Sequence, residues 1–183
     1  MNQMTARQRL DDWDKAGRSV FTRNDLAKIF HEDSPKTLQE GLNRLRQHGI
    51  LEGVTRGIYC YALSRTPKTF RLEDIARAMR RGEYSYVSLE SALSAYGAIS
   101  QIPVDRLTVM TTGRKGTFRT PYGTLEFTHT SRPIIDLLPR MKDIGRPLKM
   151  ATPYAAWEDL KRVGRNIDLV DVEAIHALEC SPK

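Results

Sequence analysis

Apolar residues in the first part of the chain recur every three or four positions, which is the spacing of amphipathic helices. Residues 4–16 predict a first helix with Leu10 and Trp13 as buried anchors and Gly17 as its stop. Thr22 is a typical N-cap residue and predicts the start of a second helix. This second helix carries an acidic residue at the capping-box position and an apolar face, namely Asp25, Leu26, Ile29 and Phe30.

A third helix follows after a short turn. Ser34 is expected to cap it, Pro35 suits the first helical position because its missing N–H costs nothing there, and Gly49 ends it. On a helical wheel at roughly 100° per residue, the leucines of this segment fall on one face, which we expect to pack inward. These inward positions are Leu38, Leu42 and Leu45, with Gly41 beside them.

The pattern then changes to the alternation of β-strands. Residues 50–55 and 58–63 alternate apolar and polar positions, and Arg56-Gly57 between them predicts a tight hairpin. Helix, turn, helix and hairpin over residues 22–63 form the layout of a winged helix-turn-helix. Such a module places its recognition helix in the major groove of DNA and a loop beside it.

Polar side chains cover the face of the third helix that lies opposite the leucines. Lysine and arginine can bind phosphate or guanine, and asparagine and glutamine can pair with adenine. An arginine at the hairpin tip is well placed for a phosphate or for the minor groove. The alternatives are an ordinary solvated helix face and a surface hairpin with an incidental arginine. The candidate DNA-binding residues are Lys36, Thr37, Gln39, Asn43, Arg44, Gln47 and Arg56, with Glu40 on the same face.

Residues 64–68 combine polar side chains with a proline and predict a linker, so we place a DNA-binding domain at residues 1–66 and a second domain at residues 67–183. The second domain mixes helical and strand patterns without a run of βαβ units. The predicted fold class is α+β, with an N-terminal winged helix-turn-helix followed by a mixed α/β C-terminal domain. The predicted helices are residues 72–81, residues 89–96 capped by Ser88, and residues 153–163; the predicted strands are residues 84–87, 107–112, 118–120 and 124–128, and residues 167–178 close the chain as helix or as strand plus helix.

Net charge changes this picture only slightly. The chain carries +7, yet the residues up to Thr66 hold eleven Lys and Arg against eight Asp and Glu. Positive charge is therefore not concentrated in the segment expected to bind DNA. A DNA-binding function must rest on where individual side chains point rather than on overall basicity.

The two cysteines, Cys60 and Cys180, have no CxxC partner and no histidine at zinc-ligand spacing. We expect both to be buried thiols in a reducing cytoplasm, without a bound metal. No apolar run is long enough to span a bilayer, and the start of the sequence shows no signal-peptide pattern. These observations predict a cytoplasmic protein that does not associate with a membrane.

Motifs for catalysis are weak. The loop at residues 113–116 (GRKG) lacks the spacing of a phosphate-binding P-loop, and a basic loop between strands explains it better. Asp168, Asp171 and Glu173 could bind a metal, but acidic residues on a solvated element are far commoner. No nucleophile elbow and no HExxH motif is present. The sequence therefore predicts neither a cofactor nor an enzyme.

Several short motifs together resemble the AbiEi antitoxins of bacterial type IV toxin–antitoxin systems. The resemblance spans nearly the whole chain, although the chain is short for that family. Its motifs are RGIY at residues 56–59, YVSLESAL at residues 86–93, YG at residues 96–97, TVMTTGR at residues 108–114, TPYGTLEF at residues 120–127 and ATP at residues 151–153.

The resemblance implies a function for each domain. The N-terminal domain would bind inverted repeats near its own promoter and repress its operon. The C-terminal domain would counteract a nucleotidyltransferase toxin, without a stable complex being required. The signature of such a toxin, Gly-Ser followed by Asp-x-Asp, is absent from this sequence. Two alternatives remain: a transcriptional regulator whose second domain dimerises or senses a ligand, and a nucleic-acid-processing enzyme that uses Arg114, Lys115, Asp168 and Asp171.

Overall fold

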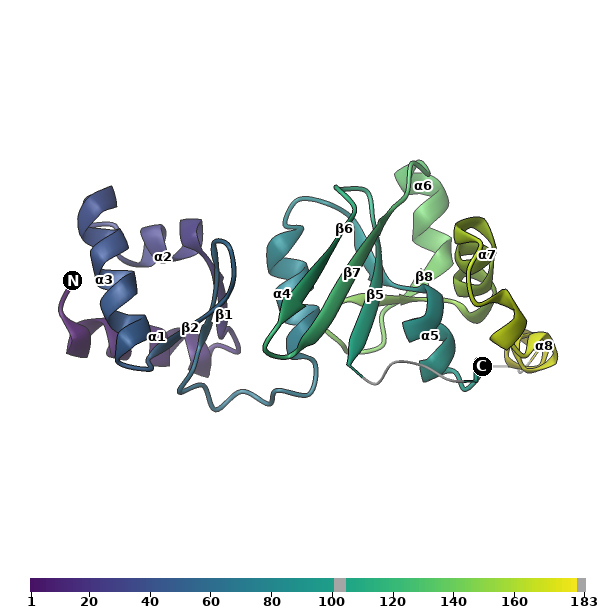
Figure 1. Cartoon of the computed structure of the whole chain (residues 1–183), viewed down its shortest axis with the longest axis horizontal. Coiled ribbons are helices and arrows are strands. Elements are labelled where there is room, and N and C mark those ends of the chain that lie inside the picture. Colours follow the sequence, from purple (N-terminus) through teal and green to yellow (C-terminus); the bar gives the residue numbers. More distant parts are fainter. Residues whose placement is uncertain (101–104, 181–183) are drawn as a thin grey trace. The chain divides into compact units, whose positions relative to one another are not determined.

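The computed structural model describes residues 1–100 and 105–180, and it divides the chain into two compact units, Met1–Met79 and Arg80–Lys183. The first unit combines helices with a small sheet, and the second is built around a larger sheet (Figure 1). The predicted α+β fold class is thereby confirmed. In the described residues, no helix is both long enough and apolar enough to cross a membrane.

The first unit has the arrangement of a winged helix-turn-helix. Among its described residues, β1, β3 and β2 form a three-stranded antiparallel sheet in that order, and the hairpin of β2 and β3 is the wing. In chain order its elements are α1 (Gln3–Lys15), β1 (Val20–Thr22), α2 (Arg23–Ile29), α3 (Pro35–Gln47), β2 (Leu51–Thr55), β3 (Ile58–Tyr61) and α4 (Arg71–Met79).

The sequence reading missed β1. This strand is short, and it exists because Val20, Phe21 and Thr22 pair with Cys60, Tyr59 and Ile58 of β3. Its last residue, Thr22, also caps α2. The predicted capping box is confirmed, since Thr22 N–H donates to Asp25 Oδ2 at 2.8 Å and Asp25 N–H donates to Thr22 Oγ1 at 3.1 Å.

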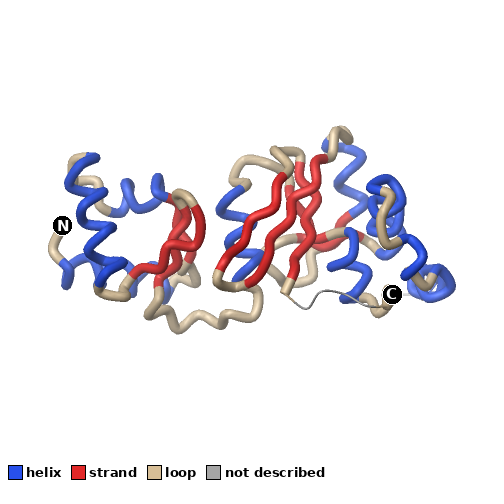
Figure 2. Tube along the Cα trace, in the orientation of Figure 1, coloured by secondary structure: helices blue, strands red, loops and turns tan. Residues whose placement is uncertain are grey.

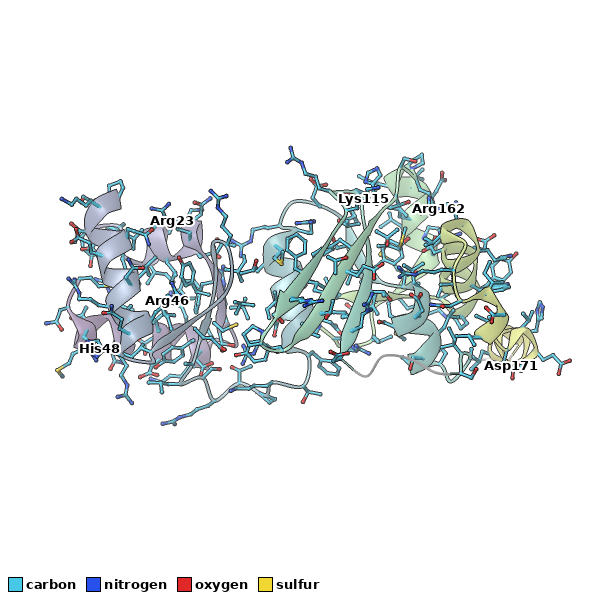
Figure 3. The ribbon with its side chains drawn as sticks, in the orientation of Figure 1. Arg23, Arg46, His48, Lys115, Arg162 and Asp171 are labelled. Atoms are coloured by element: carbon cyan, nitrogen blue, oxygen red, sulfur yellow. The ribbon has the colours of Figure 1, made fainter. Side chains whose placement is uncertain are left out.

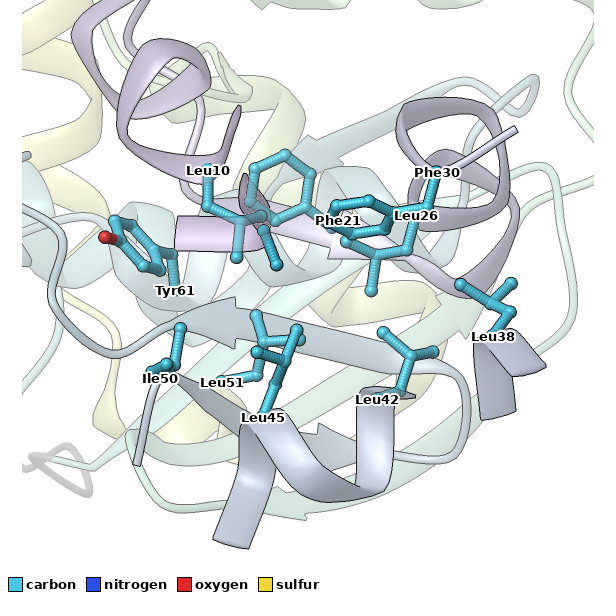
Figure 4. Close-up of a cluster of buried hydrophobic side chains, with 11 residues drawn as sticks. Leu10, Phe21, Leu26, Phe30, Leu38, Leu42, Leu45, Ile50, Leu51 and Tyr61 are labelled. Atoms are coloured by element: carbon cyan, nitrogen blue, oxygen red, sulfur yellow. The ribbon is translucent and has the colours of Figure 1, made fainter. Parts of the chain in front are cut away.

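The core of the first unit lies between the helices and the sheet (Figure 4). The leucines predicted to face inward from α3 are buried there, as is Leu10 of α1. The prediction that Trp13 is a buried anchor is wrong, because its side chain is 40% exposed. The buried position in that turn is Asp14. The core consists of Ala6, Leu10, Phe21, Leu26, Phe30, Leu38, Leu42, Leu45, Ile50, Leu51 and Tyr61.

The predicted linker is attached to α1. The Asp14 carboxylate accepts hydrogen bonds from Arg65 N–H and Thr66 Oγ1, both at 2.8 Å, and from the Ser64 hydroxyl. Beyond it, α4 packs against β1 and β3. The compact first unit therefore includes α4 and ends at Met79, whereas the sequence places the boundary after residue 66.

In the second unit, the described strands form a six-stranded mixed sheet in the order β6-β7-β5-β4-β9-β8, drawn in red in Figure 2. The pairs β5/β7 and β4/β9 are parallel, and the other pairs are antiparallel. The elements are β4 (Ser85–Val87), α5 (Leu89–Ala95), β5 (Arg106–Thr111), β6 (Gly116–Thr120), β7 (Gly123–His129), α6 (Ile134–Leu137), η1 (Leu138–Arg140), β8 (Met141–Lys142), β9 (Lys149–Ala151), α7 (Pro153–Val163), η2 (Ile167–Leu169) and α8 (Val172–Cys180).

Helix α5 packs against β5 and α7, and α7 packs against β9 and α8. Ser88 occupies the N-cap position of α5 as predicted, but its hydroxyl does not cap the helix. It donates instead to Asp159 Oδ2 of α7 at 2.9 Å. The next residue, Leu89, is fully buried at a positive φ of 57°, a conformation that is uncommon for a side chain of this type.

Candidate nucleic-acid interface

The outward face of α3 is open to solvent. Lys36, Asn43, Arg44 and Gln47 are exposed, and Thr37 and Gln39 are half-buried. The helix begins as the sequence predicts: Ser34 Oγ accepts from Thr37 N–H at 3.2 Å, and Pro35 occupies the first turn. Its inward leucines hold it against the core, so the polar face has a defined orientation.

Three of the candidate residues form hydrogen bonds with side chains of the same helix or its cap. The Thr37 hydroxyl lies 2.9 Å from Ser34 Oγ, and Gln39 Nε2 donates to Asn43 Oδ1 at 3.3 Å. An amide oxygen accepts two hydrogen bonds, so Asn43 keeps one acceptor position and its NH₂ donors. This is the pattern that asparagine needs to pair with adenine. Gln39 therefore orients Asn43 rather than presenting a fully exposed group of its own.

The wing is tied to the start of α2. Gly57 takes a positive φ of 75° in the turn that follows Arg56, as a tight hairpin requires. The carbonyl of Gly57 accepts a hydrogen bond from Arg23 N–H at 2.8 Å. Arg23 and Arg56 are both exposed, so two arginines lie at adjoining positions of this edge (Figure 3 labels Arg23). The sequence reading missed Arg23 because its placement depends on this tertiary hydrogen bond.

Ion pairs distinguish the basic residues near α1 from those of α3, the wing and the start of α2. Those on or near α1 have carboxylate partners: Arg9 pairs with Glu32 at 2.7 Å, and Arg18 pairs with Asp25 at 2.6 Å. Arg7 and Lys15 lie near Asp11 and Asp12 of the same helix. Among the described residues, no ion pair involves the basic side chains of α3, the wing or the start of α2, namely Arg23, Lys36, Arg44, Arg46 and Arg56.

The first unit has only a small net positive charge, but that charge is unevenly compensated. Carboxylates compensate the positive charge on the α1 side, whereas the positive charge around α3 and the wing remains available to an external anion. DNA is such an anion, and phosphate contacts from Lys and Arg supply most of the affinity of DNA-binding proteins. The arrangement favours nucleic acid without any general excess of basic residues.

A groove of about 730 Å³ separates the C-terminal half of α3 from β2. Asn43, Arg46 and Gln47 line its helical wall, and Glu52 and Gly53 line its strand wall. Arg46 was not among the predicted DNA-binding residues, because its position on the helical wheel lies between the polar face and the leucines. Only the packing of the wing beside α3 makes this flank part of a concave surface.

The backbone carbonyls of the loop at residues 113–116 of the second unit contact side chains from other elements. The Arg80 guanidinium donates to the Arg114 carbonyl at 2.7 and 3.1 Å, and the Gly113 carbonyl lies 2.8 Å from His129 Nδ1. Arg114 and Lys115 are exposed (Figure 3 labels Lys115). The loop therefore resembles a buttressed turn between strands, with two cations on its outer side.

The acidic residues near the end of the chain have separate positions. Asp171 accepts a hydrogen bond from Ala174 N–H at 3.0 Å and so caps α8. In the part of the chain that the structure describes, no group of His, Cys, Asp or Glu side chains is arranged to hold a metal ion. Cys60 is buried in β3, whereas the side chain of Cys180 lies outside the described residues.

A buried carboxylate joins several elements of the second unit. Asp159 of α7 is fully buried and accepts hydrogen bonds from the Tyr86 hydroxyl at 3.0 Å, from Ser88 at 2.9 Å and from Arg140 at 3.2 Å. Burial, and then the charge of Asp159, raise the pKa of Tyr86 above its ordinary value of 10.0. The cluster thus connects β4, η1 and α7 through neutral and charged hydrogen bonds.

A second polar cluster lies around Arg165. Its guanidinium donates to Glu90 at 2.7 and 3.1 Å and also contacts Glu126, while Asn166 donates to Glu90 at 2.9 Å. Burial alone would raise the pKa of Glu90, but these hydrogen bonds outweigh it and hold the pKa below its ordinary value of 4.5. Both clusters join elements of the second unit through hydrogen bonds and ion pairs, although Arg140 Nε in the first cluster is buried without a hydrogen-bond partner.

Comparisons with known proteins find a family model that matches part of the first unit. Residues 8–62 match the family model described as "Transcriptional regulator, AbiEi antitoxin". The chain is also similar in fold to the crystal structure of the RV2827C protein from Mycobacterium tuberculosis, with a TM-score of 0.50 and 16% identity, covering 100% of this chain and 73% of that one. A comparison with curated proteins gives no match. The structural similarity is evidence of fold alone.

Proposed function

We propose that the chain, whose residues 8–62 match the family model described as "Transcriptional regulator, AbiEi antitoxin", is the antitoxin of a type IV toxin–antitoxin operon. In this proposal the first unit binds inverted repeats at the operon's own promoter and represses transcription. The second unit counteracts a nucleotidyltransferase toxin, with or without a stable complex between the two proteins.

The division of ion pairs carries the DNA-binding part of the proposal. Among the described residues, no ion pair joins the basic side chains of α3, the wing and the start of α2 to a carboxylate, and these are the elements with which a winged helix meets DNA. The exposed amides of Asn43 and Gln47 lie on the same face and can read base edges. Lys36, Arg44 and Arg56, with Arg23 beside the wing, would hold the duplex through its phosphates.

Two copies on one operator follow from inverted repeats, because a two-fold arrangement of protein matches a two-fold arrangement of DNA. The proposal does not require a dimer in free solution. Regulation by this route fits the family description, which names both a transcriptional regulator and an antitoxin.

DNA binding is tested by a mobility-shift assay with the duplex upstream of the gene and a scrambled duplex of the same composition. We expect tighter binding to the upstream duplex, and a shifted species with two proteins bound. Reporter transcription from the same promoter should fall when the protein is expressed. Equal binding to both duplexes, together with unchanged reporter output, would reject autorepression.

The antitoxin half is tested by co-expression with the neighbouring gene. If that gene encodes a nucleotidyltransferase that arrests growth, we expect the full chain to restore growth. A catalytically inactive form of the neighbouring protein serves as the control for expression burden. Persistent arrest, with both proteins present in the cell, would sink the antitoxin half while leaving the DNA-binding half intact.

The second candidate is a transcriptional regulator whose second unit forms an interface with another chain or senses a ligand. Large apolar side chains exposed around α6 favour it, since Ile134 is 47% exposed, Ile135 is 74% exposed and Leu138 is 44% exposed. Surfaces of this kind often mark a binding site. A neighbouring gene unrelated to nucleotidyl transfer, together with a dimer in free solution that Ile135→Lys disrupts, would support this candidate.

A further inference from the structure

Arg46 lines the groove between α3 and β2. A Cβ atom built on Gly53 would lie 3.0 Å from Arg46 Nε, 3.1 Å from Cζ and 3.2 Å from Nη2. The guanidinium therefore lies against the strand at a place where a side chain would displace it. Gly53 has no positive φ that would call for glycine on backbone grounds. Its missing side chain is instead matched to Arg46 (labelled in Figure 3).

A glycine within a strand weakens the strand, and it often marks a bulge or a close approach. The pairing of β2 with β3 does shift between Gly53 and Thr55. A bulge that depends on glycine needs the left-handed conformation, which Gly53 does not take. The close approach of Arg46 is thus the feature that a larger residue at this position would disturb.

Charge around Arg46 leaves it available to an anion. Among the described residues, no ion pair joins Arg46 to a carboxylate, although Glu52 lines the same groove. Glu52 has an interaction of its own with another residue. An exposed guanidinium keeps its planar set of N–H donors, which favours bidentate binding of phosphate.

The helical wheel places Arg46 beside the base-reading face. At roughly 100° per residue, Asn43 and Gln47 lie close together, Arg44 lies on one flank of that pair, and Arg46 lies on the other flank, toward the wing. A helix in the major groove has a sugar–phosphate backbone on each side. Arg46 therefore lies on the flank of α3 that faces β2 of the wing.

From these observations we propose that Arg46, seated on Gly53, is a phosphate-binding residue for the DNA strand that runs through the groove between α3 and β2. The inference rests on the proposed DNA-binding function and adds a specific contact to it. Gly53 acts as a positioning residue in this proposal, because a side chain at this position would require the guanidinium of Arg46 to move.

The test measures the affinity of the full chain for the upstream duplex and for the scrambled duplex over a series of salt concentrations, by fluorescence anisotropy. We expect Arg46→Gln to weaken binding to both duplexes and to lower the slope of log affinity against log salt by about 0.9, the change for one lost phosphate contact. Arg46→Lys should keep the slope and lose only part of the affinity, because lysine retains the positive charge but lacks the planar guanidinium that binds phosphate with two hydrogen bonds.

Gly53→Val tests whether Gly53 positions Arg46. Valine suits a β-strand, yet its side chain occupies the space of the guanidinium, so we expect the same loss as in Arg46→Gln while Arg46 is still present. The double variant Arg46→Gln/Gly53→Val should lose no more than either single variant. Lys15→Gln removes the same charge from the last turn of α1, where Lys15 pairs with Asp12, and should leave the slope unchanged.

An unchanged slope in Arg46→Gln, with the fold intact by circular dichroism, would overturn the inference while DNA binding stands. If the losses of DNA affinity in Gly53→Val and Arg46→Gln add up in the double variant, the positioning role of Gly53 would be overturned. If Gly53→Val fails to fold, the comparison of Arg46→Gln with Arg46→Lys still decides the phosphate contact. A wild-type chain that binds neither duplex at low salt would instead reject the proposed function as a whole.

Discussion

At the scale of single residues, Asn43 is the side chain best prepared to read a base. Gln39 fixes the orientation of its amide, and its remaining donors and acceptor face solvent. If Asn43 pairs with adenine, Asn43→Ala should cost about 1–3 kcal/mol of binding free energy and relax specificity at one base pair. Gln39→Ala should weaken discrimination at that same base pair by a smaller amount.

Competition with upstream duplexes that carry single base-pair changes measures this effect. Asn43→Ala should lose discrimination at one position and keep it elsewhere. A uniform loss across all duplexes would mean that Asn43 binds the backbone, and a loss in Gln39→Ala at a different position would separate the two amides.

Tyr61 provides a residue-scale prediction for stability. Burial and a hydrogen bond to Asp11 raise its pKa from 10.0 to about 12. The folded state thus holds the phenol proton more tightly than the unfolded state. The resulting stabilisation is complete below pH 10.0 and is lost as the pH rises toward about 12. Chemical denaturation over this pH range should show the free energy of unfolding decreasing.

Tyr61→Phe removes the titrating group, so its unfolding free energy should fall less steeply over the same pH range. The absorbance of tyrosinate provides an independent measure, because wild-type Tyr61 should ionise later than exposed tyrosines. Parallel pH profiles for wild type and Tyr61→Phe would show that another group controls alkaline stability.

The candidate site was predictable from the sequence only where its determinants are local. Helical periodicity identified the polar face of α3, and the Arg56-Gly57 turn identified the wing tip. Arg23 and Arg46 were missed because each depends on a partner distant in the sequence, the Gly57 carbonyl and the Gly53 backbone. The prediction for Trp13 also failed because of a long-range contact. Asp14, the next residue, takes the buried position in that turn by accepting hydrogen bonds from residues 64–66.

At the scale of secondary-structure elements, α3 depends on its first turn. Ser34 accepts from Thr37 N–H, one of the donors that a helix start leaves unsatisfied. Ser34→Ala should therefore lower the free energy of unfolding of the first unit by about 1 kcal/mol. Ser34→Asp should keep the stability close to wild type, because aspartate caps equally well. Urea denaturation followed by circular dichroism measures both variants, and equal stability of Ser34→Ala and wild type would mean that the cap contributes nothing.

Elements with a strong internal pattern were predicted well, and those that need a partner were not. The inward leucines predicted α3, the β-branched residues at 107–112 predicted β5, and Pro153 predicted the start of α7. All three predictions lie close to the observed bounds. Strands β1, β8 and β9 were missed because they are too short to show a period, and their hydrogen bonds come from partner strands: β1 pairs with β3, and β9 pairs with β4 and β8. Pairing, rather than local preference, determines such strands.

At the scale of the whole molecule, the end of the DNA-binding unit has a measurable consequence. Helix α4 packs against β1 and β3, and its buried Arg71 donates to the Ser19 hydroxyl. A fragment of residues 1–79 should fold cooperatively and bind the upstream duplex. A fragment of residues 1–66 lacks α4 and should unfold at a lower urea concentration, because it leaves apolar surface of the sheet uncovered. Equal unfolding midpoints would favour the shorter boundary that the linker composition suggests.

The two-unit organisation leads to a test of whether repression and antitoxicity are separable. The residues proposed to contact DNA all lie in the first unit, and the second unit is the part to which we assign neutralisation of the toxin in our proposal. The double variant Asn43→Ala/Arg46→Gln should therefore release reporter transcription from the promoter and still restore growth when co-expressed with the neighbouring toxin from an unrelated promoter. Lys15→Gln is the matched control and should retain both activities. Loss of growth rescue in the double variant, at a protein level equal to wild type, would mean that the α3 face also takes part in neutralisation, and the assignment of one task to each unit would have to be abandoned.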